Sequence, residues 1–218
     1  MSVRIVQALV AVALMASASV AFGQAPALAG GSESRPALVG ESESGPALEV
    51  KTASELPIWK TVTVGLHRGA DAVRNAFDDA RIVVGESADE ILGRPAFTFA
   101  PERRELNLVL RSVVELGFDA QGAALADIHA RALRLGLELC PEEDGPQLRL
   151  QYSDQPVGQF LHVAMKPQRT YHGDMIDFTL ANSGAGLALL GGAARPDIVM
   201  AGNVTFVFVR PSAQQVSR

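Results

Sequence analysis

Polar and apolar residues alternate through most of the chain after position 147, with the two-residue period of β-strands that bury one face. The alternation predicts strands at 148–152, 159–165, 175–180, 187–190 and 204–209. Glycine-containing turns are expected between strands, including residues 184–186 and 191–192. Strands joined by short turns run antiparallel, because a parallel pair needs a long crossover. The C-terminal half is therefore predicted to be an antiparallel β-meander.

The region before position 147 shows helical spacing as well as alternation. Apolar residues three and four positions apart predict helices at 66–80 and 125–135, and a shorter one at 87–93. Arg74 and Asp78 are expected to pair on the first helix, Ser87 and Glu90 to form a capping box, and Gly136 to end the last helix. The predicted strands are 60–64, 82–85 and 105–111, with a helical turn at 113–116 where both periods fit.

These elements predict an α+β fold in which helices from the N-terminal half pack on the meander, covering one face of its sheet. Leu150 and Phe208 are expected to face the core from near strands. The same alternation would place Arg149 and Gln151 on the opposite face of the sheet.

The N-terminus has the pattern of a secretory signal peptide. Arg4 precedes an apolar run that ends in the small-residue pattern of residues 21–23. We expect residues 1–23 to be removed, leaving Gln24 first, or Phe22 if cleavage follows Ala21. An uncleaved membrane anchor or a buried helix is the alternative, against which the polar residues and abundant alanine of the run argue. The predicted location is periplasmic or extracellular, and the absence of a cysteine after the leader excludes a lipid anchor at a lipobox.

A repeat of period ten follows the leader, with Pro-Ala-Leu at 26–28, 36–38 and 46–48. The spacers consist mostly of glycine, serine and glutamate, which offer little apolar surface to offset ordering entropy. We predict a flexible linker at 24–56, a single domain at 57–211 and a disordered tail at 212–218. The repeated tripeptide could instead be a docking peptide.

Charge and cysteine content exclude several functions. Removal of Arg4 with the leader changes the formal net charge from -5 to -6, so the chain has no electrostatic reason to bind nucleic acid or anionic lipid. Cys140 is the only cysteine, which rules out an intramolecular disulfide. Its apolar and acidic neighbours indicate a buried, inert thiol rather than a nucleophile.

One stretch resembles a domain found in uncharacterised bacterial proteins. The resemblance rests on Leu-Cys-Pro-Glu at 139–142, Gly-Pro-Gln-Leu-Arg-Leu-Gln-Tyr at 145–152, Asp-Gln-Pro at 154–156 and the strand at 206–210. It covers 61–210 and implies a shared fold, with no established activity. The chain departs from the family pattern at His129, where an aromatic residue is expected, and at 158–160, where Gly-Gln-Phe replaces Gly-Glu-Trp.

Chemistry-bearing residues form no local catalytic motif. His172 and Asp174 share a predicted loop, but two ligands are too few for a zinc site, so we predict neither metal nor cofactor. The predicted polar sheet face, the turn after it and this loop give the candidate binding residues Arg149, Gln151, Tyr152, Asp154, Gln155, His172 and Asp174.

Two functions remain open. The first is a non-enzymatic exported domain, tethered by its linker, that binds an unknown protein or a cell-envelope component. The alternative is a secreted hydrolase whose site assembles only in three dimensions. A pocket holding two or more of His129, His162, His172 and Asp174 would favour the hydrolase.

Overall fold

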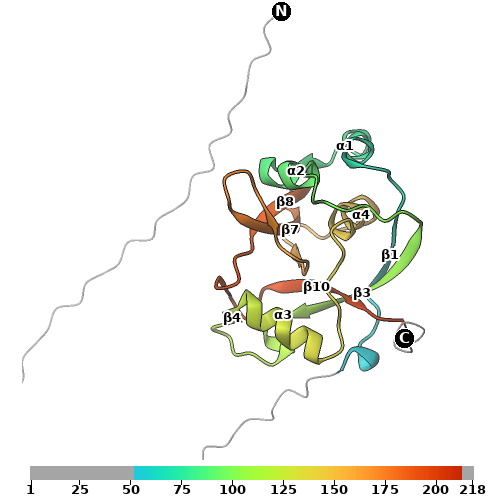
Figure 1. The fold of residues 1–218 in the computed structure, drawn as a ribbon. Coiled ribbons are helices and arrows are strands. Elements are labelled where there is room, and N and C mark those ends of the chain that lie inside the picture. The colour runs from blue at the N-terminus through green and yellow to red at the C-terminus, as the bar shows by residue number, and fades with distance from the viewer. Residues whose placement is uncertain (1–51, 213–218) are drawn as a thin grey trace, which may run out of the picture. The chain divides into compact units, whose positions relative to one another are not determined.

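Helices and strands are interspersed along residues 52–212, the part of the chain that the computed structural model describes (Figure 1). The helices are η1 (Ala53–Glu55), α1 (Ala70–Asp79), α2 (Glu86–Leu92), η2 (Val114–Leu116), α3 (Leu125–Arg134) and α4 (Asp144–Gln151). The strands are β1 (Lys60–Val64), β2 (Val83–Val84), β3 (Arg104–Ser112), β4 (Ala123–Ala124), β5 (Phe160–Val163), β6 (Gln168–Arg169), β7 (Met175–Asn182), β8 (Leu187–Ala193), β9 (Val199–Met200) and β10 (Thr205–Arg210). The α+β class predicted from the sequence is confirmed.

The main sheet has the strand order β1-β3-β10-β5-β7-β8-β2, with β6 added beside β7. Strands β5, β7 and β8 form the expected antiparallel meander. The last strand leaves it: β10 lies between β3 and β5, antiparallel to β3 and parallel to β5, where Phe206 is opposite His162. The long connection from β8 to β10, which includes β9, allows this return across the sheet.

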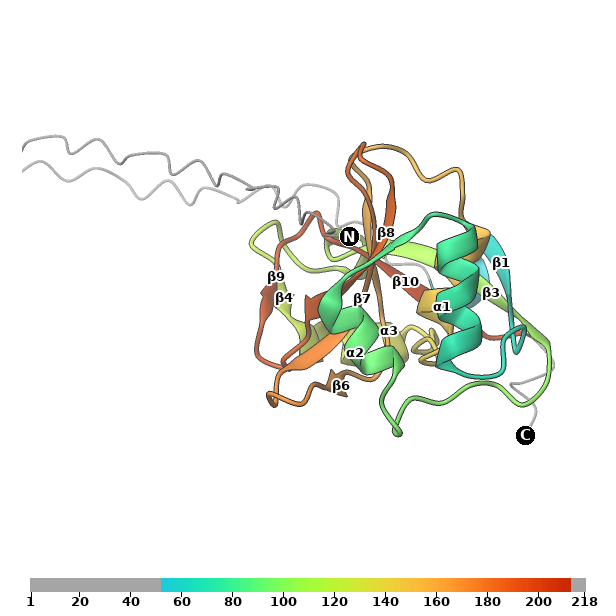
Figure 2. The same ribbon diagram turned by 90° about the horizontal axis from the view of Figure 1, so that it is seen from above.

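Helices cover both faces of the sheet, not one as expected. The two core clusters share β10, whose Val207 and Val209 face one cluster while Phe206 and Phe208 face the other. Helices α1, α2 and α4 lie on the first side and α3 on the second (Figure 1), and Figure 2 views the domain from the side of α1 and α2. A two-sided core explains why β10 is apolar at four consecutive positions.

The strand predicted at 148–152 is wrong, because these residues belong to helix α4 and the turn after it. Pro146 is tolerated because it lies in the first helical turn, where its missing N–H would have no intrahelical partner. The alternation did not mark an outer face, since Arg149 is as fully buried as Leu148. Leu150 therefore lies on no strand and is only partly buried, whereas Phe208 is fully buried as expected.

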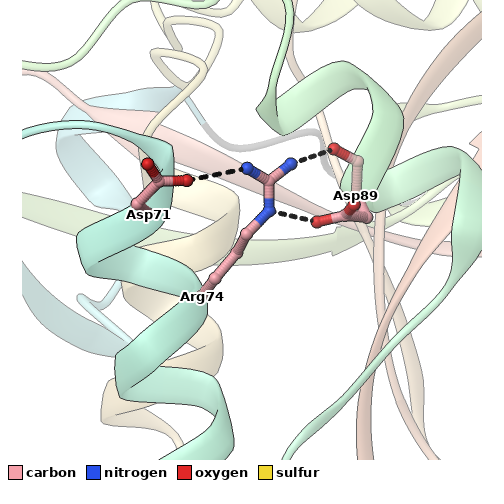
Figure 3. A network of polar contacts seen from close by, with 3 residues as sticks. All are labelled: Asp71, Arg74 and Asp89. Atoms are coloured by element: carbon pink, nitrogen blue, oxygen red, sulfur yellow. Dashed lines mark hydrogen bonds and ion pairs between the residues drawn. The ribbon is translucent and has the colours of Figure 1, made fainter.

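Several local expectations are corrected around α1 and α2. Arg74 does not pair with Asp78: its guanidinium contacts Asp71 and, at 2.6 Å from Nε to Oδ1, Asp89, and so joins the two helices (Figure 3). The expected capping box is absent because the N-cap of α2 is Gly85, two residues before Ser87. The predicted stop of α3 is confirmed, with Gly136 at φ 82°.

Residues 191–192 are not a turn but part of β8, opposite Phe178 and Asp177 of β7. The predicted turn at 184–186 does connect these two strands.

The fold begins before the predicted boundary at position 57. Ala53 and Leu56 are buried, and the Ala53 amide donates a hydrogen bond to the Leu135 carbonyl at 2.8 Å. Residues 52–56, assigned to the linker from the sequence, therefore pack on the domain. The predicted signal peptide, the period-ten repeat and residues 213–218 lie outside the described residues. Within 52–212, no helix has the length and apolar character needed to cross a membrane.

Candidate functional site

Residues 149–159 form an internal polar network around α4. Arg149 is fully buried, and its guanidinium donates to the side-chain oxygen of Gln155 and the carbonyl of Tyr152. Burial lowers the pKa of Arg149 to about 10. Gln155 in turn donates to the carbonyls of Gln159 and Leu180, at 3.0 and 3.3 Å. These side chains connect α4 to the meander and present no recognition surface.

The other candidates of this segment also make internal contacts. The Gln151 carboxamide binds the backbone of Thr63 on β1. The Tyr152 hydroxyl donates to Gln159 at 2.8 Å, and its ring packs edge-on against Trp59. Asp154 is exposed and lies 3.8 Å from the ammonium group of Lys60, an ion pair of small energetic value at such exposure.

His172 and Asp174 lie in the turn between β6 and β7, as the sequence suggested, and both are exposed. Neither lines any of the three cavities characterised between residues 52 and 212. Within this part of the chain, no three histidine, cysteine, aspartate or glutamate side chains are grouped to hold a metal ion.

The acidic run at the start of α4 fastens a long loop to the domain. Glu142 accepts hydrogen bonds from the Thr98 amide at 2.9 Å and from Gln168 at 2.8 Å. Glu143 is buried and accepts from the amides of Ala100 and Gly65, at 2.6 and 2.9 Å. The segment before β3 is thus held by two carboxylates of one helix end.

Asp144, the third acid of the run, is fully buried, and neither of its carboxylate oxygens accepts a hydrogen bond within the described residues. Burial raises the pKa of Asp144 to about 7, with a further increase from Glu143 and an opposing effect of Cys140 and Arg104. Cys140 is buried, as expected from the sequence, and its own pKa is raised by burial and by Asp144. A thiol in this state is a poor nucleophile.

The loop held by Glu142 and Glu143 borders a cavity of about 460 Å³, which we call the 98–104 cleft. Its lining residues are Val64, Thr98, Phe99, Ala100, Pro101, Glu102, Arg103, Arg104, Pro141 and Glu143. Arg103 and Arg104 are exposed, and neither forms an ion pair within 4.0 Å among residues 52–212. The cleft therefore combines apolar walls with two available cations.

A second cavity, of about 360 Å³, lies where β5 and β10 begin, and we call it the His162 cavity. It is lined by Gly158, Gln159, Phe160, His162, Asn203, Val204 and Thr205. His162 Nδ1 lies 3.3 Å from Thr179 Oγ1 and 3.9 Å from Asp177 Oδ1. Asp177 is buried, and neither of its carboxylate oxygens accepts a hydrogen bond within the described residues. Burial raises the pKa of Asp177.

His129 belongs to α3 and does not line either cavity. Its ring packs edge-on against Phe206, whose ring also contacts His162 at a centroid distance of 5.5 Å. The Nε2 atom of His129 is buried without a hydrogen-bond partner in the described residues, and burial lowers its pKa to about 4. His162 is thus the one member of the sequence-derived set of four that lines either cavity.

Asp177 and Thr179 were missed as candidates. The sequence does place them two residues apart on β7, and this spacing puts both side chains on one face of the strand. The alternation could not place His162 opposite Thr179, because that requires the pairing of β5 with β7.

No protein-family model, curated protein or solved structure shows a significant match to this chain.

Proposed function

We propose that residues 52–212 are the binding domain of an exported protein, and that the 98–104 cleft holds a carboxylate-bearing, partly apolar segment of a partner protein. The observation that carries the proposal is the pair of guanidinium groups, on Arg103 and Arg104, beside apolar walls. Guanidinium groups bind carboxylates with two parallel hydrogen bonds, which favours this charge on the ligand. The lining also contains two acids. Glu143 already accepts internal hydrogen bonds, so Glu102 is the one exposed acid beside the two arginines.

The wall of the cleft is held in place before any ligand arrives. Thr98 and Ala100 are hydrogen-bonded to Glu142 and Glu143, which directly precede α4, so the loop that they belong to has little freedom to lose on binding. A smaller loss of conformational entropy favours affinity. Phe99, Pro101 and Val64 supply apolar surface for an aliphatic or aromatic side chain of the partner.

The cellular setting of the proposal comes from the sequence. The signal-peptide pattern of residues 1–23 supports export to the periplasm or the extracellular space. The net negative charge gives no support to a nucleic-acid or membrane-surface partner.

The alternative, a secreted hydrolase, has less support. A hydrolase would be favoured by a pocket that holds at least two of His129, His162, His172 and Asp174. His162 lines its cavity without the other three residues. The acidic run at 142–144 could have supplied paired carboxylates. Glu142 and Glu143 instead hold the loop by hydrogen bonds, and Asp144 is fully buried.

Fluorescence anisotropy tests the proposal. The probes are short fluorescein-labelled peptides in which glutamate alternates with leucine, and matched peptides with lysine in place of glutamate. We expect the full chain to bind the acidic peptides more tightly, and Arg103→Glu to weaken this binding by about tenfold or more because it replaces attraction with repulsion. Arg134→Glu on α3 is the matched control, since Arg134 is exposed and lies outside the cleft. Equal binding of both peptide series, or an equal loss in the control, would refute the proposal.

A further inference from the structure

The His162 cavity differs in chemistry from the 98–104 cleft and shares no lining residue with it. None of its lining side chains is an aspartate, glutamate, lysine or arginine. His162, Asn203 and Thr205 supply neutral hydrogen-bonding groups, whereas the Gln159 side chain already accepts from Tyr152. Phe160 adds an aromatic ring, and half of the residue's surface is exposed. The cavity therefore offers hydrogen bonds and an apolar face without a compensating charge.

His162 is supported from behind by a polar cluster on the neighbouring strands. Thr179 lies directly opposite it on β7, and Asp177 lies two residues along the same face. Gly192 of β8 is opposite Asp177, and a Cβ atom there would lie 2.6 Å from Asp177 Oδ1 and 2.8 Å from Thr179 Oγ1. A residue with a side chain at 192 would collide with these oxygens, so the glycine leaves the space that they occupy.

This cluster fixes one nitrogen of the imidazole and leaves the other available. Thr179 and Asp177 both lie on the Nδ1 side of the ring, and a carboxylate there favours the tautomer with the proton on Nδ1. Nε2 makes no hydrogen bond within residues 52–212 and is then an acceptor. Asp177 itself is too deeply buried to meet a ligand, with 1% of its surface exposed. A buried carboxylate without hydrogen bonds is costly, and its place behind a cavity-lining histidine gives it a positioning role.

We infer that the His162 cavity binds a neutral sugar residue. Sugar hydroxyl groups both donate and accept hydrogen bonds, which suits the Asn203 amide, the Thr205 hydroxyl and the His162 acceptor. The C–H face of a sugar ring packs on an aromatic ring such as Phe160. Phosphates and carboxylates lack a cationic partner here, and a ligand cation has no accessible carboxylate. The cavity is also within the usual size range of small-ligand sites.

Amide NMR spectra of the full chain test this inference. The probes are D-glucose, N-acetyl-D-glucosamine and a short oligomer of the latter, with acetate and inorganic phosphate as anionic comparisons. We expect the sugars to shift the amide signals of Phe160, His162 and Asn203, with Kd values of ~1 mM or weaker for the single sugars. Tighter binding of the oligomer would identify a glycan chain as the source of the sugar, and equal affinity a free sugar. Larger shifts at these residues with acetate or phosphate, or none with any sugar, would overturn the inference.

Variants separate the cavity from its surroundings. Phe160→Ala should weaken sugar binding by about tenfold, because it removes the aromatic face while changing a half-exposed position. Val157→Ala is the matched control, an exposed apolar residue nearby in the sequence that does not line the cavity. Asp177→Asn keeps the shape of the side chain. It should weaken sugar binding and change the tautomer of His162, which the NMR shifts of the ring nitrogens report. Equal losses in Phe160→Ala and Val157→Ala would contradict the site. Binding of the acidic peptides is independent of all three variants, so failure here leaves the proposed function standing.

Discussion

The side-chain amide of Gln151 binds both backbone groups of Thr63. Its Nε2 donates to the Thr63 carbonyl at 2.9 Å, and its Oε1 accepts from the Thr63 amide at 3.0 Å. Strand β1 is the edge of the main sheet, with β3 on its other side. The carboxamide therefore occupies the position that the backbone of another strand would take and protects this edge from pairing with a second chain.

Replacement of Gln151 with alanine should lower the free energy of unfolding by about 1–2 kcal/mol. Two hydrogen bonds between α4 and β1 are lost, and two backbone groups of Thr63 lose their partner. Chemical denaturation followed by circular dichroism measures the change. The outward-facing strand position that the sequence predicts for Gln151 would instead make the effect negligible, because such a residue contacts mainly solvent.

The matched control is Gln121→Ala. Gln121 is exposed in the loop before β4, and its side chain forms no hydrogen bond within the described residues. Its replacement should change the free energy of unfolding by less than about 0.5 kcal/mol. Similar values for the two variants would show that the contact between Gln151 and Thr63 contributes nothing.

The sequence predicted most elements of the fold because their periodicity reflects burial on one side. Strand β1 and helix α3 each bury one recognisable set of positions. Helix α4 is different: Gln147, Leu148 and Arg149 are all buried, so no exposed face imposes a helical period. The alternation of leucine with polar residues then resembled a strand. Only the tertiary partners of these polar side chains, such as Gln155 and Thr63, explain why they are tolerated inside.

The candidate site was less predictable than the fold, and for a related reason. The residues expected to form a polar sheet face, Arg149 and Gln151, are internal because their helix is internal. The cluster around His162 consists of residues from β5, β7 and β8 that meet only through strand register. A single strand pattern shows which residues share a face, but it does not show which strand lies beside it.

Export is predicted to shorten the chain. Protein recovered from the native host should have a mass about 2.2 kDa below that of the full sequence, with Gln24 or Phe22 at its N-terminus. Intact-mass spectrometry with N-terminal sequencing measures this, and protein retained in the cytoplasm of a host with blocked secretion is the control. An exported chain that still begins at Met1 would contradict the prediction.

His129 should make the domain sensitive to acid. Its pKa is lowered from 6.5 to about 4 by burial, so the folded state binds fewer protons than the unfolded state between these values. Stability is then fully present above pH 6.5 and is lost as the pH falls toward 4, by up to about 3 kcal/mol. Unfolding curves across this range should show the loss in the wild type and a reduced loss in His129→Leu. His172→Leu, at an exposed position, should follow the wild type.

Asp144 should act in the opposite direction. Its pKa is raised from 3.8 to about 7, so the folded state binds more protons than the unfolded state in this range, and stability falls as the pH rises through it. The asparagine of Asp144→Asn cannot ionise. The free energy of unfolding of this variant, relative to that of the wild type, should therefore increase from pH 3.8 to pH 7 by up to about 4 kcal/mol. The difference should then stay constant at higher pH. Asp79→Asn, at an exposed position of α1, removes a carboxylate without removing a buried charge and should show no such divergence. Parallel curves of unfolding free energy against pH for Asp144→Asn and the wild type would contradict the prediction. They would mean that the Asp144 carboxyl ionises in the folded protein at little cost, because a solvent path or a cation reaches the first turn of α4.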